Sequence, residues 1–308
     1  MNNDVINPLI CNPKKGFCEM PTMEHIIEKI EAEKAIAKPI RVIYYTDPIC
    51  SSCWGIEPQL RKLKLEYGHL VDFEYRMGGL LRDWNYNDGI ITKSEDVAQH
   101  WDDVSYYFQM PINGDIWLED PLHSSYPPSI AFKAAQLQDE QKALLFLRRM
   151  RELLFIEKKN IAKWEYIAMA AVDAQLDVNK LNEDYLNGNA EQNFLEDLEL
   201  ARQLGIRGFP TIIFIGEDGI EQKIYGARPY VDYEIAIKKL LPISKKTYYD
   251  TSLNNLFLCY PSLTVKEYAE LADKNIIIAK QILDELHRIE NLKRIETKNG
   301  NLYSLRLS

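Results

Sequence analysis

The chain has 308 residues, a formal net charge of −9 and 46% hydrophobic residues. That length suits one large globular domain or two modest ones, each with its own core. The acidic balance argues against a general binder of nucleic acid or anionic membranes, because phosphate groups are held by an excess of Lys and Arg. The sequence lacks an apolar run of roughly 18 residues and a secretion signal at its start. We therefore expect a cytoplasmic protein with no nucleic-acid or membrane partner.

Residues 1–38 are predicted to form an N-terminal extension. Polar, proline-containing sequence leads into a helical pattern over Met23–Ala37, which Pro39 ends. The chain has five cysteines, and an odd number excludes a fully paired disulfide scaffold. Cys11 and Cys18 of the extension are expected to be surface thiols, with a peripheral disulfide or a metal clip as the alternatives.

A βαβ unit is predicted within residues 39–92. Strands are expected over Ile40–Thr46 and Val71–Met77, with a helix over Ser51–Tyr67 between them. Pro58 should kink this helix, because proline lacks the N–H that the helical ladder needs.

Cys50 and Cys53 stand where the first strand ends and this helix begins. A helix N-terminus carries a partial positive charge, so we expect the pKa of the Cys50 thiol to lie below its free value of about 8.5. Cys53, one helical turn away, can resolve a mixed disulfide or close an intramolecular one. A structural pair or half of a zinc site is the alternative, but zinc would need a second close pair of cysteines.

Residues 93–204 carry mainly helical patterns, and residues 205–243 return to β composition. The predicted helices are Glu95–Gln109, Pro128–Leu137, Gln141–Glu157, Ala162–Ala174 and Glu191–Gln203. Strands are then expected over Ile206–Gly216 and Ile220–Tyr225, followed by a helix over Tyr230–Leu241.

The segment Gly208-Phe209-Pro210-Thr211 directly precedes the apolar run Ile212–Ile215. A proline is tolerated at the start of a strand, where no ladder N–H is needed, and only X-Pro bonds adopt the cis form readily. We therefore expect a cis-proline loop at Pro210.

Together, the dithiol, the proline loop and the helical segment resemble the thioredoxin superfamily, and within it the DsbA-like branch with its FrnE-like dithiol-disulfide isomerases. Four stretches are similar to the SpxH (YjbH) subgroup, which presents a redox-responsive transcription factor to the ClpXP protease: Asp47–Trp54, Met77–Leu80, Tyr126–Ala135 and Phe155–Ile161. The resemblance covers about Ile40–Pro242. It implies an α/β thioredoxin fold with a large helical insertion, in which Cys50, Cys53 and Pro210 are catalytic and neither cofactor nor metal is needed.

Two positions depart from the DsbA-like pattern. Ser51 and Ser52 separate the cysteines, whereas strongly oxidising DsbA proteins place a His there to stabilise the thiolate. Phe209 precedes the proline where the family more often has a smaller aliphatic residue, so it would narrow or fill the substrate groove. Thr211 completes this loop.

Several side chains are predicted to support the dithiol. Asp47 and Glu57 are the nearest carboxylates and could accept a proton from Cys53. For Asp47 the alternative is a cap for the helix or turn, and for Glu57 it is a solvated helix face, which we favour slightly. Trp54 is expected to pack beside the dithiol as an apolar platform.

Two further residues are given structural rather than chemical roles. His123 lies in a predicted loop without a visible partner, so a surface histidine is expected. Cys259 is expected to be a buried apolar residue.

Residues 250–308 are predicted to form a small winged-helix-like module. Thr264 and Glu267 give a capping box for a helix over Val265–Ala272, followed by a helix over Asn275–Glu290 and a hairpin over Leu292–Leu305 around Asn299-Gly300. DNA binding is disfavoured because acidic residues outnumber Lys280 and Arg288 on the second helix. A protein-docking or packing role is expected instead.

Two hypotheses for the function follow. In the first, the chain is a dithiol-disulfide oxidoreductase or isomerase acting on protein thiols or disulfides. In the second, it is an adaptor that delivers a client to a ClpXP-type protease, with the dithiol as a redox sensor. We favour the enzyme, because its chemistry is carried by residues whereas client and protease are implied only by resemblance.

Overall fold

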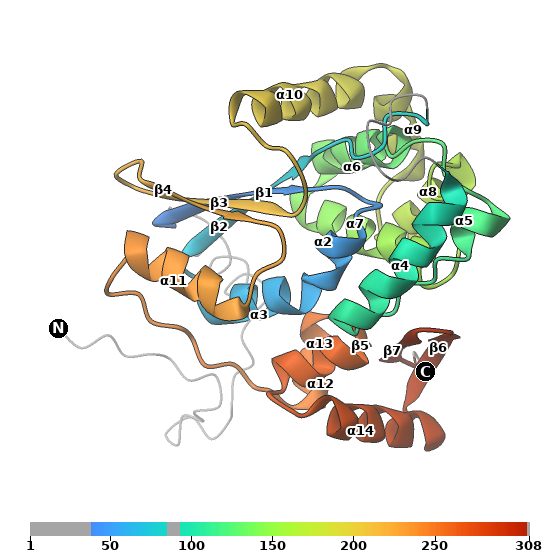
Figure 1. Cartoon of the computed structure of the whole chain (residues 1–308), viewed down its shortest axis with the longest axis vertical. Helices are drawn as coiled ribbons and strands as arrows, with labels where there is room; N and C mark the ends of the chain where they lie inside the picture. The colour runs from blue at the N-terminus through green and yellow to red at the C-terminus, as the bar shows by residue number, and fades with distance from the viewer. Residues whose placement is uncertain (1–37, 85–92, 307–308) are drawn as a thin grey trace, which may run out of the picture. The chain divides into compact units, whose positions relative to one another are not determined.

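The computed structural model describes residues 38–84 and 93–306 (Figure 1). The chain divides into two units, residues 1–39 and 40–308, and the fold below is that of the second unit. The predicted helix over Met23–Ala37, Cys11 and Cys18 lie outside the described residues.

The main sheet has four strands in the order β2-β1-β3-β4. Their bounds are β1 Ile40–Thr46, β2 Val71–Met77, β3 Thr211–Gly216 and β4 Glu221–Tyr225. β1 runs parallel to β2 and antiparallel to β3, which pairs antiparallel with β4. β3 begins only at Thr211 and not at Ile206, because Gly208-Phe209-Pro210 forms a loop before it.

Both faces of this sheet are buried by helices. On one face, Ile43, Tyr45 and Ile213 pack against α10 (Asn189–Gln203). On the other, Val42, Tyr44 and Ile212 belong to the main core, with side chains of α3 (Glu57–Tyr67) and α11 (Tyr230–Leu240). Figure 1 shows α10 on one side of the sheet and α3 and α11 on the other. Successive side chains of β1 point to opposite faces of the sheet, and helices cover both faces. The strand is therefore apolar at nearly every position.

The helical insertion lies between β2 and β3. Besides α10, its described helices are α4 Ser94–Phe108, α5 Ile116–Glu119, α6 Tyr126–Gln138, α7 Glu140–Phe155, α8 Trp164–Asp173 and α9 Val178–Leu186. The sequence analysis missed α5, which is a single turn, and α9. The start of α9 carried a readable signal, since the Asp177 side chain accepts hydrogen bonds from the N–H groups of Asn179 and Lys180.

The helix expected over Ser51–Tyr67 is two helices. α2 covers Ser51–Gly55, Ile56 lies between, and α3 begins at Glu57 with Pro58 in its first turn. Proline has no N–H to donate to the preceding turn, so the ladder is interrupted there. The predicted kink is therefore a break, and it leaves α2 as a short helix dedicated to the dithiol.

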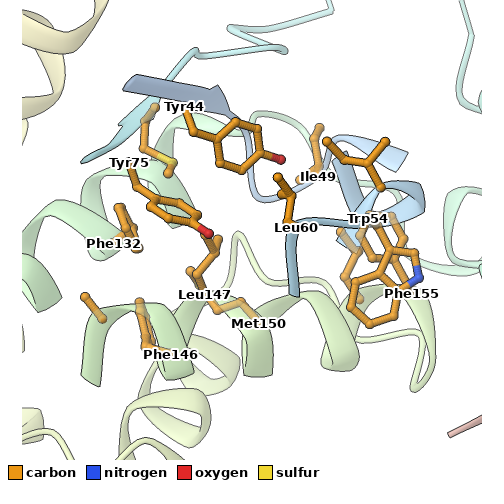
Figure 2. Packing of buried hydrophobic residues seen from close by; sticks show 14 of the residues in the cluster. Tyr44, Ile49, Trp54, Leu60, Tyr75, Phe132, Phe146, Leu147, Met150 and Phe155 are labelled. Carbon is orange, nitrogen blue, oxygen red and sulfur yellow. The ribbon is translucent and has the colours of Figure 1, made fainter. Parts of the chain in front are cut away.

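An aromatic core lies beneath this short helix. Trp54 stacks on Phe155, the last residue of α7, with ring centroids 5.5 Å apart. Tyr44 meets the edge of Tyr75 at 5.1 Å. Figure 2 shows the Tyr44 and Tyr75 rings above Leu147 and Met150 of α7. α7 therefore packs against the dithiol region and is also a helix of the insertion.

The C-terminal segment contains the two predicted helices and the predicted hairpin, preceded by a helix and a short strand that the sequence analysis missed. Its elements are α12 Leu253–Cys259, β5 Ser262–Thr264, α13 Val265–Leu271, α14 Ile276–Arg288, β6 Leu292–Thr297 and β7 Gly300–Leu305, with the small sheet in the order β5-β7-β6. The capping box between Thr264 and Glu267 is present. The α14 cations are paired with acids on their own helix, Lys280 with Asp284 and Arg288 with Glu285. Within the described ranges, a helix long and apolar enough to cross a bilayer is not found.

Candidate active site

Cys50 and Cys53 lie at the start of α2, directly after the loop that follows β1. Cys50 is the N-cap residue, and the backbone N–H of Cys53 donates to its Sγ at 3.2 Å. Both thiols are free, and the residues are 4% and 0% exposed. The sequence folds this way because Pro48 and Asp47 end the strand and the loop then turns directly into α2.

Burial and neighbouring groups shift the pKa values of the two thiols in opposite directions. Burial raises the pKa of the Cys50 thiol well above its usual value, and the neighbouring Cys53 sulfur raises it further. Burial also acts to raise the pKa of Cys53, but the hydrogen bond from Cys50, the charge of Arg151 and the hydroxyls of Thr46 and Tyr44 outweigh it and lower that pKa. The expected lowering of the Cys50 pKa is wrong, because a buried sulfur at the end of a five-residue helix loses more hydration than one N–H returns.

Arg151 is the buried residue of this site that the sequence analysis missed. It comes from α7, about a hundred positions further along the chain, and is 2% exposed. Its Nη2 donates to the Thr46 hydroxyl at 2.6 Å and to the backbone oxygen of Asp47 at 3.2 Å, and its Nη1 pairs with Glu57 at 3.3 Å. The Arg151 guanidinium therefore binds the end of β1 and the start of α3, on either side of the dithiol loop.

Asp47 holds the dithiol loop in place. Its carboxylate accepts from the N–H of Ile49 at 3.0 Å, the N–H of Leu80 at 2.7 Å and the Ser125 hydroxyl at 2.9 Å. Burial raises the pKa of Asp47 to about 6, against these hydrogen bonds and the charge of Arg151, which lower it. The sequence analysis offered Asp47 as a proton acceptor for Cys53 or as a cap for the helix or turn, and these hydrogen bonds are those of a cap.

Glu57 does not lie on a solvated helix face, so the favoured alternative for it is wrong. It pairs with Arg151 and, at 3.8 Å, with Arg61, and it is only partly exposed. Together with both arginines it lines a cavity of about 290 Å³ between α3, α7 and the segment that joins α12 to β5. Glu57 is thus linked to the dithiol region by its ion pair with Arg151, and it also lines the cavity.

Trp54 belongs to the dithiol helix α2, and its side chain has both apolar and polar partners. Its ring is fully buried on Phe155, its Nε1 donates to the backbone oxygen of Pro111 at 3.0 Å, and the Arg148 guanidinium lies 4.3 Å from the ring centroid. Such partners are typical of a buried indole, whose N–H must be satisfied.

The proline loop lies at the same edge of the sheet as the dithiol. The Phe209–Pro210 peptide bond is cis, as expected. Thr211 follows it and pairs with Tyr45 in the register of β1 and β3, which places Pro210 across from Thr46 at the start of the dithiol loop. The Thr211 hydroxyl closes the loop by donating to the Gly208 backbone oxygen at 2.7 Å.

Phe209 fills space beside this edge. Its ring lies on Gly78, where a Cβ would overlap it, and it packs with the cluster formed by β1, β3 and α10. Of the two expectations, filling the groove is the one that these contacts support.

Two remaining predictions concern residues away from the dithiol. His123 is exposed, as expected. Cys259 is exposed rather than buried, because it ends the short helix α12 with its side chain at the rim of the cavity. Within residues 38–84 and 93–306, His, Cys, Asp and Glu side chains do not form a group of three that could hold a metal.

Comparisons with known proteins agree with this arrangement. A thioredoxin family model matches residues 44–235. The chain is 31% identical to the ClpXP adapter protein SpxH of Halalkalibacterium halodurans over 304 residues, 96% of this chain and 97% of that protein. It is 27% identical to the protein of the same name from Bacillus subtilis over 85% of this chain and 88% of that protein.

Solved structures support the fold. A protein from Nitrosomonas europaea, provisionally named a protein disulfide isomerase, superposes with a TM-score of 0.59 at 20% identity, covering 67% of this chain and 98% of that one. The cytosolic disulfide reductase DsbM from Pseudomonas aeruginosa gives a TM-score of 0.50 at 22% identity, covering 60% and 89%. With its dithiol at the start of α2, its cis-proline loop and its helical insertion, the chain belongs to the thioredoxin family, among the SpxH relatives.

Proposed function

We propose that the chain exchanges disulfides with protein thiols through Cys50 and Cys53, as a dithiol-disulfide oxidoreductase or isomerase. The observation that carries the proposal is the reduced pair at the N-terminus of α2, with a hydrogen bond from the Cys53 N–H to the Cys50 sulfur. The cis-Pro210 loop lies at the same edge of the sheet, where a client backbone can run beside the sulfurs.

The exchange uses the charge already present in the pair. The proton of Cys50 passes to the neighbouring Cys53 sulfur, and the Cys50 thiolate attacks the client disulfide R–S–S–R′. This forms the mixed disulfide Cys50–S–S–R and releases R′–S⁻, which takes the proton from Cys53. Cys53 then attacks the Cys50 sulfur, which closes the internal disulfide and releases R–S⁻. Two electrons have moved from the dithiol to the client, and the reverse sequence oxidises a client dithiol.

Substitution of single cysteines tests this proposal. Cys50→Ser should abolish reduction of a disulfide-linked fluorescent peptide with glutathione as electron donor, and Cys53→Ser should accumulate the mixed disulfide at Cys50. Cys259→Ser is the matched control, because that thiol is exposed and away from the dithiol helix. Turnover by the Cys50→Ser protein at the wild-type rate would show that the pair is not the reacting group.

A second candidate is an adaptor that delivers a client to a ClpXP-type protease, with the dithiol sensing oxidation. It is favoured by the extent of the similarity to SpxH of Halalkalibacterium halodurans. That alignment covers 96% of the chain, so it includes most of the C-terminal segment, whereas the thioredoxin family model ends at residue 235.

Reconstitution separates the two candidates. An adaptor should accelerate the degradation of a redox-responsive transcription factor by purified ClpXP, and the Cys50→Ser/Cys53→Ser protein should retain this effect under reducing conditions. A degradation rate that is the same with and without the chain would count against the adaptor and would leave the exchange chemistry untouched.

A further inference from the structure

The cavity beside Glu57 is lined mainly by apolar side chains. Its volume is about 290 Å³, and it lies where α3, α7 and the segment between α12 and β5 meet. All three contribute apolar side chains to it: Leu60 from α3, Leu144 and Leu147 from α7, and Tyr260 and Pro261 from the segment. Small-molecule sites are of this kind, mostly apolar with a few polar groups that orient the ligand, and this volume is at the lower end of their range.

Three arginines also line the cavity, and each of them already has a carboxylate partner. These pairs are Arg61 with Glu267 at 3.3 Å, Arg148 with Glu152 at 2.7 Å and Arg151 with Glu57 at 3.3 Å. The charges of these six side chains sum to zero. The arginines therefore do not call for a further anion.

Lys64 of α3 is different, because its ammonium group has no carboxylate partner within residues 38–84 and 93–306. Its Nζ donates to the Tyr75 hydroxyl at 2.8 Å and lies 4.8 Å from the centre of the Tyr75 ring and 5.2 Å from that of Phe73. Aromatic faces attract an ammonium group but do not neutralise it, and two of its three donors remain for other acceptors. Lys64 lines the cavity, which thus combines apolar walls with one positive charge that is not neutralised.

We propose that this cavity binds a small monocarboxylate with an apolar body. The carboxylate pairs with Lys64, and the apolar part packs against Leu60, Leu144 and Tyr260. A single negative charge matches the one unpaired cation, whereas a second one would meet the Glu57 carboxylate. Since the ligand contacts α3, α7 and the C-terminal segment together, its binding stabilises the packing of that segment on the dithiol domain.

The first test measures the affinity of the full-length protein for three probes by ligand-observed NMR titration. The first probe, 3-phenylpropanoate, carries both the charge and the apolar body. 3-Phenylpropanamide lacks the charge, and acetate lacks the apolar body. We expect 3-phenylpropanoate to bind about tenfold more tightly than either of the others, the effect of one charge-assisted contact or of a buried ring. Equal affinities for the acid and the amide, or no binding of the acid at millimolar concentration, would overturn the proposal.

The second test compares Lys64→Met with Lys62→Met. Lys62 lies on the same helix and loses the same charge, but it pairs with Glu270 at 3.6 Å and does not line the cavity. We expect Lys64→Met to weaken binding of 3-phenylpropanoate about tenfold relative to Lys62→Met, and Lys64→Arg to keep most of the affinity. The same affinity in both methionine variants would show that Lys64 does not hold the carboxylate.

Two further variants locate the ligand. Leu144→Trp fills the cavity with a larger side chain and should abolish binding, so wild-type affinity in this variant would place the ligand elsewhere. Cys50→Ser/Cys53→Ser should bind 3-phenylpropanoate as the wild type does, because the cavity does not include either sulfur. Loss of binding in the double serine protein would assign the ligand to the dithiol and refute the cavity site. The exchange chemistry is tested separately, by turnover, and does not depend on these outcomes.

Discussion

Glu267→Gln should loosen the C-terminal segment from the dithiol domain. Glu267 lies on α13, is 0% exposed, and accepts from Arg148 at 2.6 and 3.1 Å and from the Thr264 N–H at 2.7 Å. Arg61 of α3 lies 3.3 Å from the same carboxylate. One buried carboxylate thus joins α13 to both α3 and α7, the two helices that flank the dithiol region.

The size of the effect follows from what the amide cannot replace. Glutamine keeps the shape of the side chain but removes its charge. Within the described residues, the carboxylate partner left to Arg148 is then Glu152 at 2.7 Å, and the one left to Arg61 is Glu57 at 3.8 Å. Breaking a buried pair by neutralising one partner costs about 3–5 kcal/mol. Because the remaining amide oxygen still accepts a hydrogen bond, we expect the free energy of unfolding to fall by about 3 kcal/mol.

The pH dependence has a definite sign. The charges of Arg148 and Arg61 and the hydrogen bonds to Glu267 hold its pKa below the usual 4.5, against burial. A carboxyl group with a lowered folded pKa stabilises the protein above its unfolded pKa and loses that contribution as the pH falls through the folded pKa. The advantage of the wild type over Glu267→Gln should therefore be full at pH 7 and shrink below about pH 4.5.

Urea unfolding followed by tryptophan fluorescence measures this difference, and limited proteolysis reports whether the C-terminal segment is released first. Glu270→Gln is the matched control, since Glu270 lies on the same helix in partly exposed pairs with Lys62 and Lys266, where a loss under about 1 kcal/mol is expected. A loss for Glu267→Gln no larger than for Glu270→Gln would refute the reasoning.

Two other predictions concern the dithiol loop and the proline loop. Because burial raises the pKa of Asp47 from 3.8 to about 6, ionising it costs about 3 kcal/mol, and the stability of the wild type relative to Asp47→Asn should fall as the pH rises from about 4 to 7. A flat difference in urea-unfolding free energies across this range would contradict the shift. Gly78→Ala should cost about 1–3 kcal/mol, because its Cβ overlaps the Phe209 ring, and Phe209→Leu should recover part of that loss in a double-mutant cycle. Additive losses in thermal unfolding would show that the two residues do not contact each other.

The features that the sequence predicted are local ones. The alternation and length of apolar runs located β1, β2 and most helices within a few residues, and the break at Pro58 follows from the missing N–H of proline. The dithiol and the cis-proline loop are equally local, since each is defined by a few consecutive residues at the end of a strand. The capping box of α13 was predictable for the same reason.

The sequence analysis was wrong where burial and distant partners decide. Whether a thiol or a carboxylate is solvated depends on what packs over it, so Glu57, Cys259 and the charge on Cys50 were misassigned. Arg151 was an unremarked residue within a helical pattern, and only the packing of α7 beneath the dithiol brings it to Thr46 and Asp47.

The Cys50–Cys53 spacing therefore determined that this chain carries a dithiol, while the tertiary structure decided which groups surround the two sulfurs. The reason is physical: spacing along a helix sets how far apart two sulfurs lie, but their protonation depends on lost hydration and on charges within a few ångströms. Those charges come from α3 and α7, and only folding brings them together.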